Sequence, residues 1–356
     1  SYEARAFGVS SAMSMAEASR RCPQAVVLPV RHGLYSRVSA QVMSVLAEIT
    51  PVLEKVSIDE AFLDVTGARR RMGSPVTIGR WIRTEVRRRV GVPASVGIAS
   101  TKFVAKLASS HAKPDGLLLV PADVTQDFLD LLPVGALWGV GARTQTVLAR
   151  WGIKDVRTLA GTDVRHLERI LGRAAGRHLH ELSHGVDPRR VEPVHEEKSV
   201  GTETTFFDTV TDREHARLVL LDQSHQCAAR LRASDLRCRV VVLKARGADF
   251  TTVTRSRTLA VPTDLARDIW ETLSSLYSLL PTPAGGFRLL GVRVEGLLRP
   301  DDGVQLLLDE DPRRGASERA ADAVRRRWGS DALAPASLLG GGGGPARESL
   351  AGEGEC

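Results

Sequence analysis

KVSIDEAFLDV, residues 55–65, places two carboxylates side by side between apolar segments that each predict a strand. Neighbouring residues of a strand point to opposite faces, so a continuous strand would turn either Asp59 or Glu60 into the core. Burying an unpaired carboxylate costs on the order of several kcal/mol. Two interpretations satisfy this constraint: a tight hairpin turn with both carboxylates in water, or a turn that brings both carboxylates to one divalent cation.

The composition bounds the class of protein. A length of 356 residues is enough for two to four domains, and no apolar run is long enough to span a membrane. The four cysteines are scattered and form no CxxC pair, which argues against a disulfide framework or a zinc site and favours the reducing cytoplasm. The net charge of +7 suggests a polyanionic partner. The low aromatic content argues against a base-stacking platform.

The first 120 residues alternate helical and strand patterns. The predicted elements are a strand at 28–30, a helix at 34–49, two strands around Asp59 and Glu60, a helix at 75–90, a buried strand at 94–100, a helix capped by Ser100 or Thr101, and a strand at 117–120. From residue 34 this order predicts a βαββαβ sheet without its first strand. Because that strand is central, its absence would leave a gap lined by unpaired backbone groups.

Residues 121–190 are predicted to be helical, with glycine-containing turns. Gly139 and Gly141 separate two helical patterns within LWGVGARTQTVLARWGI (137–153), and a second turn lies in LGRAAGRHL (171–179). Tandem turns of this kind resemble helix-hairpin-helix motifs, in which backbone N–H groups at a helix N-terminus bind a DNA phosphate. The alternative is a plain pair of helices with glycine at a helix end.

A second sheet is predicted after a linker that is rich in Pro, Arg and Glu, which we place at 191–197. Strands at 199–207, 237–245, 251–260 and 287–297, with helices at 212–233 and 263–279, give a second βαββαβ pattern. One sheet face should pack on the helices and the other should be exposed. Either a nucleic-acid contact or an ordinary solvated face would explain the basic residues that we assign to the exposed side: Lys198, Arg255, Arg257, Arg288 and Arg293. A polar loop, a helix at 316–328 and a disordered tail with five glycines at 340–344 are expected to follow.

Four motifs then occur in a telling order: SYEARAFGV (1–9), SIDEAFLDV (57–65), SVGIASTKFVAKLASSHAKPDG (95–116) and KSVGTETTF (198–206). With them the chain resembles the Y-family translesion DNA polymerases of the bacterial DNA polymerase IV branch, from residue 1 to about 298. The resemblance implies an α+β multidomain, right-hand fold with a ferredoxin-like palm. Its parts would be fingers at 1–31, palm at 32–120, a helix-hairpin-helix thumb at 121–190, a βαββαβ little finger at 198–298 and a C-terminal region at 299–356.

The resemblance also implies a chemistry, namely template-directed, error-prone DNA synthesis by nucleotidyl transfer with two Mg²⁺ ions. Asp59 and Glu60 match the family's catalytic, metal-binding carboxylates. Tyr2, Arg5 and Lys113 match residues that grip the triphosphate of the incoming dNTP.

Further contacts are implied for the DNA and for a protein partner. The residues expected to bind primer–template DNA are Gly139, Gly141, Lys198, Ser199, Thr202, Arg255, Arg257 and Arg293. Gln305, Leu306 and Leu308 resemble the peptide that docks bacterial polymerases on the sliding clamp, although Asp309 replaces its usual aromatic residue. The alternative for this run is packing on its own domain. The protein is expected to be a cytoplasmic monomer.

The resemblance breaks at the N-terminus. The family's first palm strand carries another metal-binding aspartate and a steric gate against ribonucleotides. Neither feature is present in this sequence, which starts at Ser1. Because the chain does not begin with methionine, we expect a fragment or a processed product. Two hypotheses follow: a polymerase whose N-terminal segment is absent here, or a catalytically inactive relative that binds DNA or repair proteins. A helix-hairpin-helix nuclease or glycosylase is disfavoured, because no additional catalytic cluster accompanies the hairpins.

Overall fold

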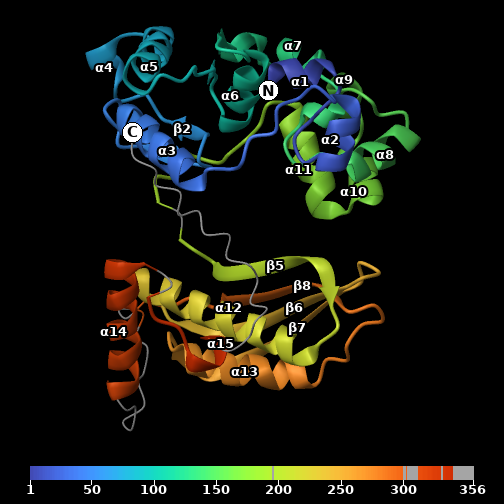
Figure 1. Ribbon diagram of the computed structural model, residues 1–356. Coiled ribbons are helices and arrows are strands. Elements are labelled where there is room, and N and C mark those ends of the chain that lie inside the picture. The colour runs from blue at the N-terminus through green and yellow to red at the C-terminus, as the bar shows by residue number, and fades with distance from the viewer. Residues whose placement is uncertain (195, 300–301, 303–311, 330–331, 340–356) are drawn as a thin grey trace. The chain divides into compact units, whose positions relative to one another are not determined.

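The computed structural model describes residues 1–194, 196–299, 302, 312–329 and 332–339. The chain divides into two compact units, Ser1–His195 and Glu196–Cys356, whose elements are labelled in Figure 1. Two hydrophobic cores lie in the first unit and one lies in the second. Among the described helices, none combines the length and the apolar character that a membrane crossing requires.

The first unit begins with two short helices whose first turns are capped by serine hydroxyls, α1 (Tyr2–Ala6) and α2 (Met15–Arg21). The strand predicted at 28–30 is wrong, because these residues form neither helix nor strand. Leu28 is 74% exposed, and Pro29 has no N–H to contribute to a ladder. A short apolar run without a neighbouring strand therefore remains an irregular segment.

The first core is formed by α3 (His32–Ala47), β1 (Leu53–Lys55), β2 (Ala61–Leu63), α4 (Arg69–Met72) and α5 (Pro75–Val90). The predicted helix at 75–90 is confirmed: Ser74 caps its first turn, and it ends at Gly91, whose φ of +78° is the left-handed conformation that glycine favours. Its stripe of Ile78, Ile82 and Val86 is buried, as four-residue spacing requires.

A parallel pair of strands and a helix follow: β3 (Val96–Ile98), α6 (Lys102–His111) and β4 (Leu117–Leu119). Of the two predicted caps, Ser100 and Thr101, it is Thr101 that caps α6. A Cβ added to Gly97 would lie 2.0 Å from the carbonyl oxygen of Ala105, so β3 and α6 approach at backbone distance. Within the described residues, β1–β2 and β3–β4 are two separate sheets. This arrangement matches the predicted order of elements without a strand that joins them.

The second core packs α6 against a helical region, as predicted for residues 121–190. Its helices are α7 (Thr125–Asp130), α8 (Ala142–Arg150), α9 (Val156–Ala160), α10 (Val164–Leu171) and α11 (Arg173–Ser183). The segment before Gly139 differs from the prediction, because it is a single 3₁₀ turn at Val134–Ala136 rather than a helix. A second 3₁₀ turn, Ala122–Val124, precedes α7.

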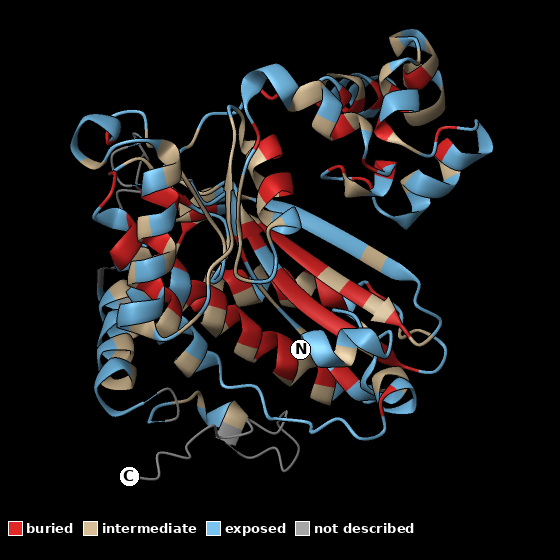
Figure 2. Ribbon diagram, turned by 90° about the horizontal axis from the view of Figure 1, so that it is seen from above, coloured by how far each residue is buried: buried red, intermediate tan, exposed pale blue. Residues whose placement is uncertain are grey.

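The second unit has the predicted βαββαβ order: β5 (Ser199–Val210), α12 (Arg213–Ala233), β6 (Cys238–Gly247), β7 (Thr252–Thr263), α13 (Ala266–Ser278) and β8 (Phe287–Glu295). The strands form one antiparallel sheet in the order β5-β8-β6-β7, and α12 and α13 cover one of its faces (Figure 1). The central strands are mostly buried and the edge strands mostly exposed (Figure 2). Two further helices follow, α14 (Pro312–Trp328) and α15 (Ala336–Leu339).

Candidate active site

The two adjacent carboxylates lie in the turn of the β1–β2 hairpin. Leu53 pairs with Leu63 and Lys55 with Ala61, so residues 56–60 form the turn. The backbone N–H groups of Val56 and Ser57 donate to the carbonyl oxygen of Glu60, at 3.0 and 3.2 Å. A turn therefore resolves the problem of alternation, because neither carboxylate is forced into the core.

The side chains of the turn differ in their surroundings. Asp59 is exposed, and its carboxylate accepts a hydrogen bond of 2.5 Å from the hydroxyl of Ser57. The Glu60 side chain is 42% exposed and pairs with Lys106 on α6, with 2.5 Å between Oε2 and Nζ. The Ser57 hydroxyl thus orients one carboxylate, and the ammonium group of Lys106 orients the other.

Lys102, one turn before Lys106 on α6, binds a second carboxylate of the hairpin. Its Nζ lies 2.5 Å from Oε2 of Glu54, and both side chains are at most 10% exposed. The backbone N–H of Glu192 also donates to Glu54, at 2.9 Å. This pair is not among the residues predicted from the sequence. Its signals were two lysines at i and i+4, and a glutamate inside an apolar strand, where a carboxylate needs a partner.

Trp138 connects the hairpin to the helical region. Its ring lies 5.2 Å from Nζ of Lys106 and 4.7 Å from the guanidinium carbon of Arg189, and its centroid lies 6.4 Å from that of Phe62. Cations over an indole face are attracted to its electron-rich surface. The indole therefore lies close to two cations, one of which also binds Glu60.

Asp187 holds Arg189, the second of the two cations beside Trp138, in place. Its side chain is fully buried and accepts hydrogen bonds from Nε and Nη2 of Arg189, at 2.7 and 2.9 Å, and from the backbone N–H of Phe103, at 3.1 Å. Burial alone would raise the pKa of Asp187, but the hydrogen bonds and charge of Arg189 outweigh it and hold that pKa below its usual value. The carboxylate is therefore ionised at neutral pH and ties the start of α6 to the segment after α11.

The residues expected to grip a triphosphate are all exposed. Tyr2 and Arg5 lie on α1, where the guanidinium carbon of Arg5 is 5.9 Å from the centroid of the Tyr2 ring. Lys113 follows α6, next to a cis peptide bond at Pro114. In the described part of the chain, no hydrogen bond or ion pair links these three residues to Asp59 or Glu60.

Both glycines of the predicted phosphate-binding turn precede α8. Gly139 has a φ of +90°, and Gly141 is the N-cap of α8 without a side chain that could accept its free N–H groups. Beside this turn lies a shallow hollow of about 270 Å³, whose lining includes Trp138, Gly139 and Arg189. The turn thus leaves donors free at the start of a helix, as both interpretations of the sequence allow.

The sheet of the second unit separates the predicted DNA-binding residues between its two faces. Ser199 and Arg293 lie on the face that the helices leave open. Arg255 and Arg257 lie on the other face, because their register partners Leu243 and Val241 belong to the core beneath the helices. Placing all of them on the exposed side was therefore wrong, although both arginines are exposed at the edge strand β7.

The remaining predicted contacts are also placed. Thr202 is half-buried toward α12, where its hydroxyl donates to Gln226 at 3.3 Å, so it does not lie on the open face either. Lys198 is exposed just before β5. Arg288 is half-buried, with its guanidinium carbon 5.3 Å from the Phe250 ring centroid. The predicted clamp peptide, Gln305–Leu308, and the glycine-rich tail lie outside the described residues.

Comparison with known proteins places this chain in a family. Residues 1–110 match the impB/mucB/samB family, and residues 197–308 match the C-terminal domain of that family. The chain belongs to the impB/mucB/samB family, and its resemblance to the Y-family polymerases of the DNA polymerase IV branch is confirmed.

Two relatives and two solved structures make the likeness specific. A protein named DNA polymerase IV from Desulfatibacillum aliphaticivorans is 40% identical over 95% of this chain and 86% of its own length. One of the same name from Streptomyces coelicolor is 42% identical over 83% of this chain and 62% of its own length. A Y-family DNA polymerase chimera built on Dbh and an insertion ternary complex of Dbh DNA polymerase superpose with TM-scores of 0.71 and 0.60. Each is 24% identical and covers 84% of this chain and 86% of its own. The predicted α+β multidomain fold is thereby confirmed.

Proposed function

We propose that this protein is a DNA-directed DNA polymerase that carries out error-prone translesion synthesis. The observation that carries the proposal is the likeness to relatives named DNA polymerase IV, which extends through both units of the chain. The exposed turn with Asp59 and Glu60 supports it, because two adjacent carboxylates held by neighbours rather than buried are suited to nucleotidyl transfer.

Asp59 and Glu60 are the proposed ligands of Mg²⁺. They offer only hard oxygen donors, and Mg²⁺ commonly takes one or two carboxylates and completes its shell with water and substrate phosphates. When bound, two such ions would activate the primer hydroxyl and neutralise the leaving pyrophosphate.

The chain's own residues have separate tasks in this proposal. The Ser57 hydroxyl fixes the rotamer of Asp59, and Lys106 keeps Glu60 at the turn until it is drawn to a cation. Tyr2, Arg5 and Lys113 would bind the dNTP triphosphate through a phenol, a bidentate guanidinium and an ammonium group.

The DNA would be held at several places along the backbone. The proposed contacts are the N–H groups of the turn at Gly139 and Gly141, then Lys198, Ser199 and Arg293, and the edge arginines Arg255 and Arg257. Phosphate contacts of this kind position a duplex without reading its sequence. The proposed parts are fingers at 1–31, palm at 32–120, thumb at 121–190 and little finger at 198–298. A cytoplasmic monomer that docks on the sliding clamp through Gln305, Leu306 and Leu308 completes the proposal.

Primer extension tests the proposed activity. The full gene product, with Mg²⁺ and dNTPs on a primed template, should extend the primer, also past a lesion such as an abasic site. Asp59→Asn keeps the shape of the turn but removes a charged ligand, so extension should fall by roughly three orders of magnitude or more. Asp64→Asn, an exposed carboxylate beyond β2, is the matched control and should leave extension within about twofold.

The same experiment separates the competing hypothesis of an inactive DNA-binding relative. If the full gene product binds primed DNA but extends no primer at any Mg²⁺ concentration, the polymerase proposal fails and the binding function replaces it. Extension that persists in Asp59→Asn would instead show that the catalytic carboxylates lie elsewhere.

A further inference from the structure

The helix α14 is unusual in its charge and lies beyond the residues matched by the family's C-terminal domain, which end at 308. Its 17 residues include six arginines and two acidic residues, a net charge of +4 out of +7 for the whole chain. More than half of the net charge of the chain is therefore concentrated on this one helix, and the direction in which its acidic and basic side chains point decides what the helix can bind.

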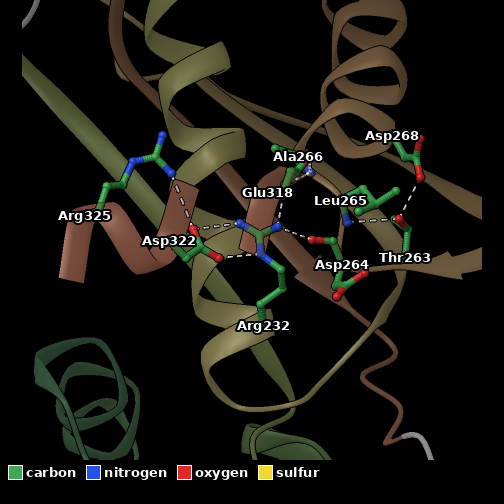
Figure 3. A network of polar contacts seen from close by, with 9 residues as sticks. All are labelled: Arg232, Thr263, Asp264, Leu265, Ala266, Asp268, Glu318, Asp322 and Arg325. Atoms are coloured by element: carbon green, nitrogen blue, oxygen red, sulfur yellow. Dashed lines mark hydrogen bonds and ion pairs between the residues drawn. The ribbon is translucent and has the colours of Figure 1, made fainter. Parts of the chain in front are cut away.

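Both acidic residues of α14 point inward, onto the end of α12 and the start of α13. Figure 3 shows the guanidinium of Arg232 between Glu318 and Asp322. Its nitrogens lie 2.5 Å from the first carboxylate and 2.6 Å from the second, and the Arg232 side chain is 6% exposed. Glu318 also accepts the backbone N–H of Ala266 at 2.9 Å, and so caps the first turn of α13. Glu318 and Asp322 therefore attach α14 to α12 and α13, and they do not neutralise the arginines on its outer side.

The outer side of α14 is left with basic and small residues. Arg319, Arg326 and Arg327 are exposed, and no carboxylate within the described residues pairs with any of them. We call these three arginines the basic face of α14. Small residues are exposed beside these arginines, namely Ala316, Ser317, Ala320 and Ala323, and they would let a partner approach the helix closely.

The chemistry of this face fits phosphate groups in a repeating array. Guanidinium groups bind phosphate oxygens through two parallel hydrogen bonds, and an ammonium group cannot do this. A membrane surface is disfavoured, because an interfacial helix needs a broad face of large apolar residues, and among the described side chains of α14 only Trp328 is both large and apolar and exposed. The guanidinium of Arg327 also lies 4.9 Å from the exposed ring of Trp328, which keeps that charge at the helix end.

We infer that the basic face of α14 binds the phosphate backbone of duplex DNA and so adds a contact beyond the little finger. This inference rests on the proposed function, which supplies the duplex. The buried network around Arg232 holds the helix rigidly on its unit, so the three arginines need little further ordering when DNA binds.

The test removes the three arginines of the basic face and measures how much the salt dependence of the DNA affinity falls. Full-length protein with Arg319→Gln, Arg326→Gln and Arg327→Gln is compared with wild type by fluorescence anisotropy on a labelled primed duplex at 50, 100 and 200 mM salt. Each lost phosphate contact should lower the salt slope by about 0.9, so the triple variant should lose about 2 to 3 from that slope and at least about tenfold in affinity at 100 mM.

A matched control removes the same charge elsewhere. Arg69→Gln, Arg70→Gln and Arg80→Gln take three exposed arginines from α4 and α5 and should weaken binding less than about threefold. The inference would be overturned if the α14 variant kept the DNA affinity of the wild type, or if both variants lost the same amount of affinity. So would a variant that binds DNA normally but loses binding to phosphatidylserine vesicles, because that result would assign the face to a membrane.

A footprint on the unmodified protein guards against a variant that fails to fold. Primed duplex should slow tryptic cleavage after Arg326 and Arg327 several-fold, and cleavage after Arg69 and Arg70 much less. Single-turnover nucleotide incorporation at saturating DNA distinguishes this inference from the proposed function. If wild type binds through α14 but extends no primer, only the polymerase proposal fails; if it extends primers and the variant binds normally, only the inference fails.

Discussion

Asp187→Asn is the substitution whose effect the structure defines most sharply. The fully buried carboxylate receives two charged hydrogen bonds from the guanidinium of Arg189 and one each from the backbone N–H groups of Arg189 and Phe103. Asparagine has nearly the same shape and still offers one oxygen to Phe103, but it cannot hold the guanidinium with a charge. The substitution should therefore loosen the join between α6 and the segment that follows α11, without leaving a cavity.

The loss of stability depends on how far water can replace the hydrogen bonds that Arg189 loses. A hydrogen bond to a charged group contributes roughly 1.5 to 3 kcal/mol, and two are weakened here. The Arg189 side chain is 40% exposed, so solvent recovers part of that loss. We expect Asp187→Asn to lower the free energy of unfolding by about 2 kcal/mol. Asp187→Ala should cost about 3 to 5 kcal/mol, because it also leaves the N–H of Phe103 without an acceptor.

The pH dependence gives an independent check on the cause. The pKa of Asp187 is lowered in the folded protein, because the hydrogen bonds of Arg189 overcome the opposing effect of burial. Its stabilisation is therefore complete above the unfolded pKa of about 3.9 and is lost as the pH falls through the lower folded value. Urea unfolding followed by circular dichroism should show a gap between wild type and Asp187→Asn that is constant near neutrality and narrows below about pH 4. The exposed Asp127→Asn is the control; a gap under about 0.5 kcal/mol, or one that does not narrow in acid, would refute the reasoning.

Three further outcomes can be measured on the same protein. Gly97→Ala should destabilise the first unit by more than about 3 kcal/mol in urea unfolding, because its Cβ would meet the backbone of α6, whereas Gly67→Ala, with open space around it, should cost under about 1 kcal/mol. Burial raises the pKa of Cys227 to about 11 and that of Cys238 to about 12, so neither thiol should be alkylated by iodoacetamide at pH 8 until urea unfolds the chain. Arg232→Met should lower the stability of the second unit by about 3 kcal/mol in thermal unfolding, because Glu318 loses its cation and Asp322 keeps only the 3.4 Å contact with Arg325.

Local patterns were sufficient where one residue's environment is set by its neighbours in the chain. The four-residue stripe of α5 and the threonine cap of α6 both depend on local spacing, and both were predicted correctly. The turn at Asp59 and Glu60 was also predictable, because a strand cannot bury two adjacent carboxylates without partners. The strand expected at 28–30 failed because a ladder needs a second strand, which no local pattern can supply.

The faces of the second sheet show a subtler failure. Arg255 and Arg257 stand at odd positions between Val253 and Leu259, and both of these apolar residues pack on the core. The same alternation that predicts a strand thus assigns the two arginines to the helix-covered side. Basic character alone therefore does not identify the face on which a strand residue lies. In an edge strand the two criteria diverge, because a long side chain can reach solvent from either face.

The pairing of Glu54 with Lys102 lay beyond sequence reasoning for another reason. Glu54 and Lys102 are 48 residues apart in the chain, so their contact depends on tertiary packing. Once α6 is in place, Lys102 and Lys106 bind the two glutamates of the β1–β2 hairpin. Asp187 accepts a hydrogen bond from the backbone of the first turn of α6. One helix therefore fixes both the proposed metal-binding turn and the start of the segment that leads out of the first unit. A disturbance at Asp187 should reach Glu60 through Arg189, Trp138 and Lys106, so primer extension by Asp187→Asn should fall more than its modest loss of stability explains.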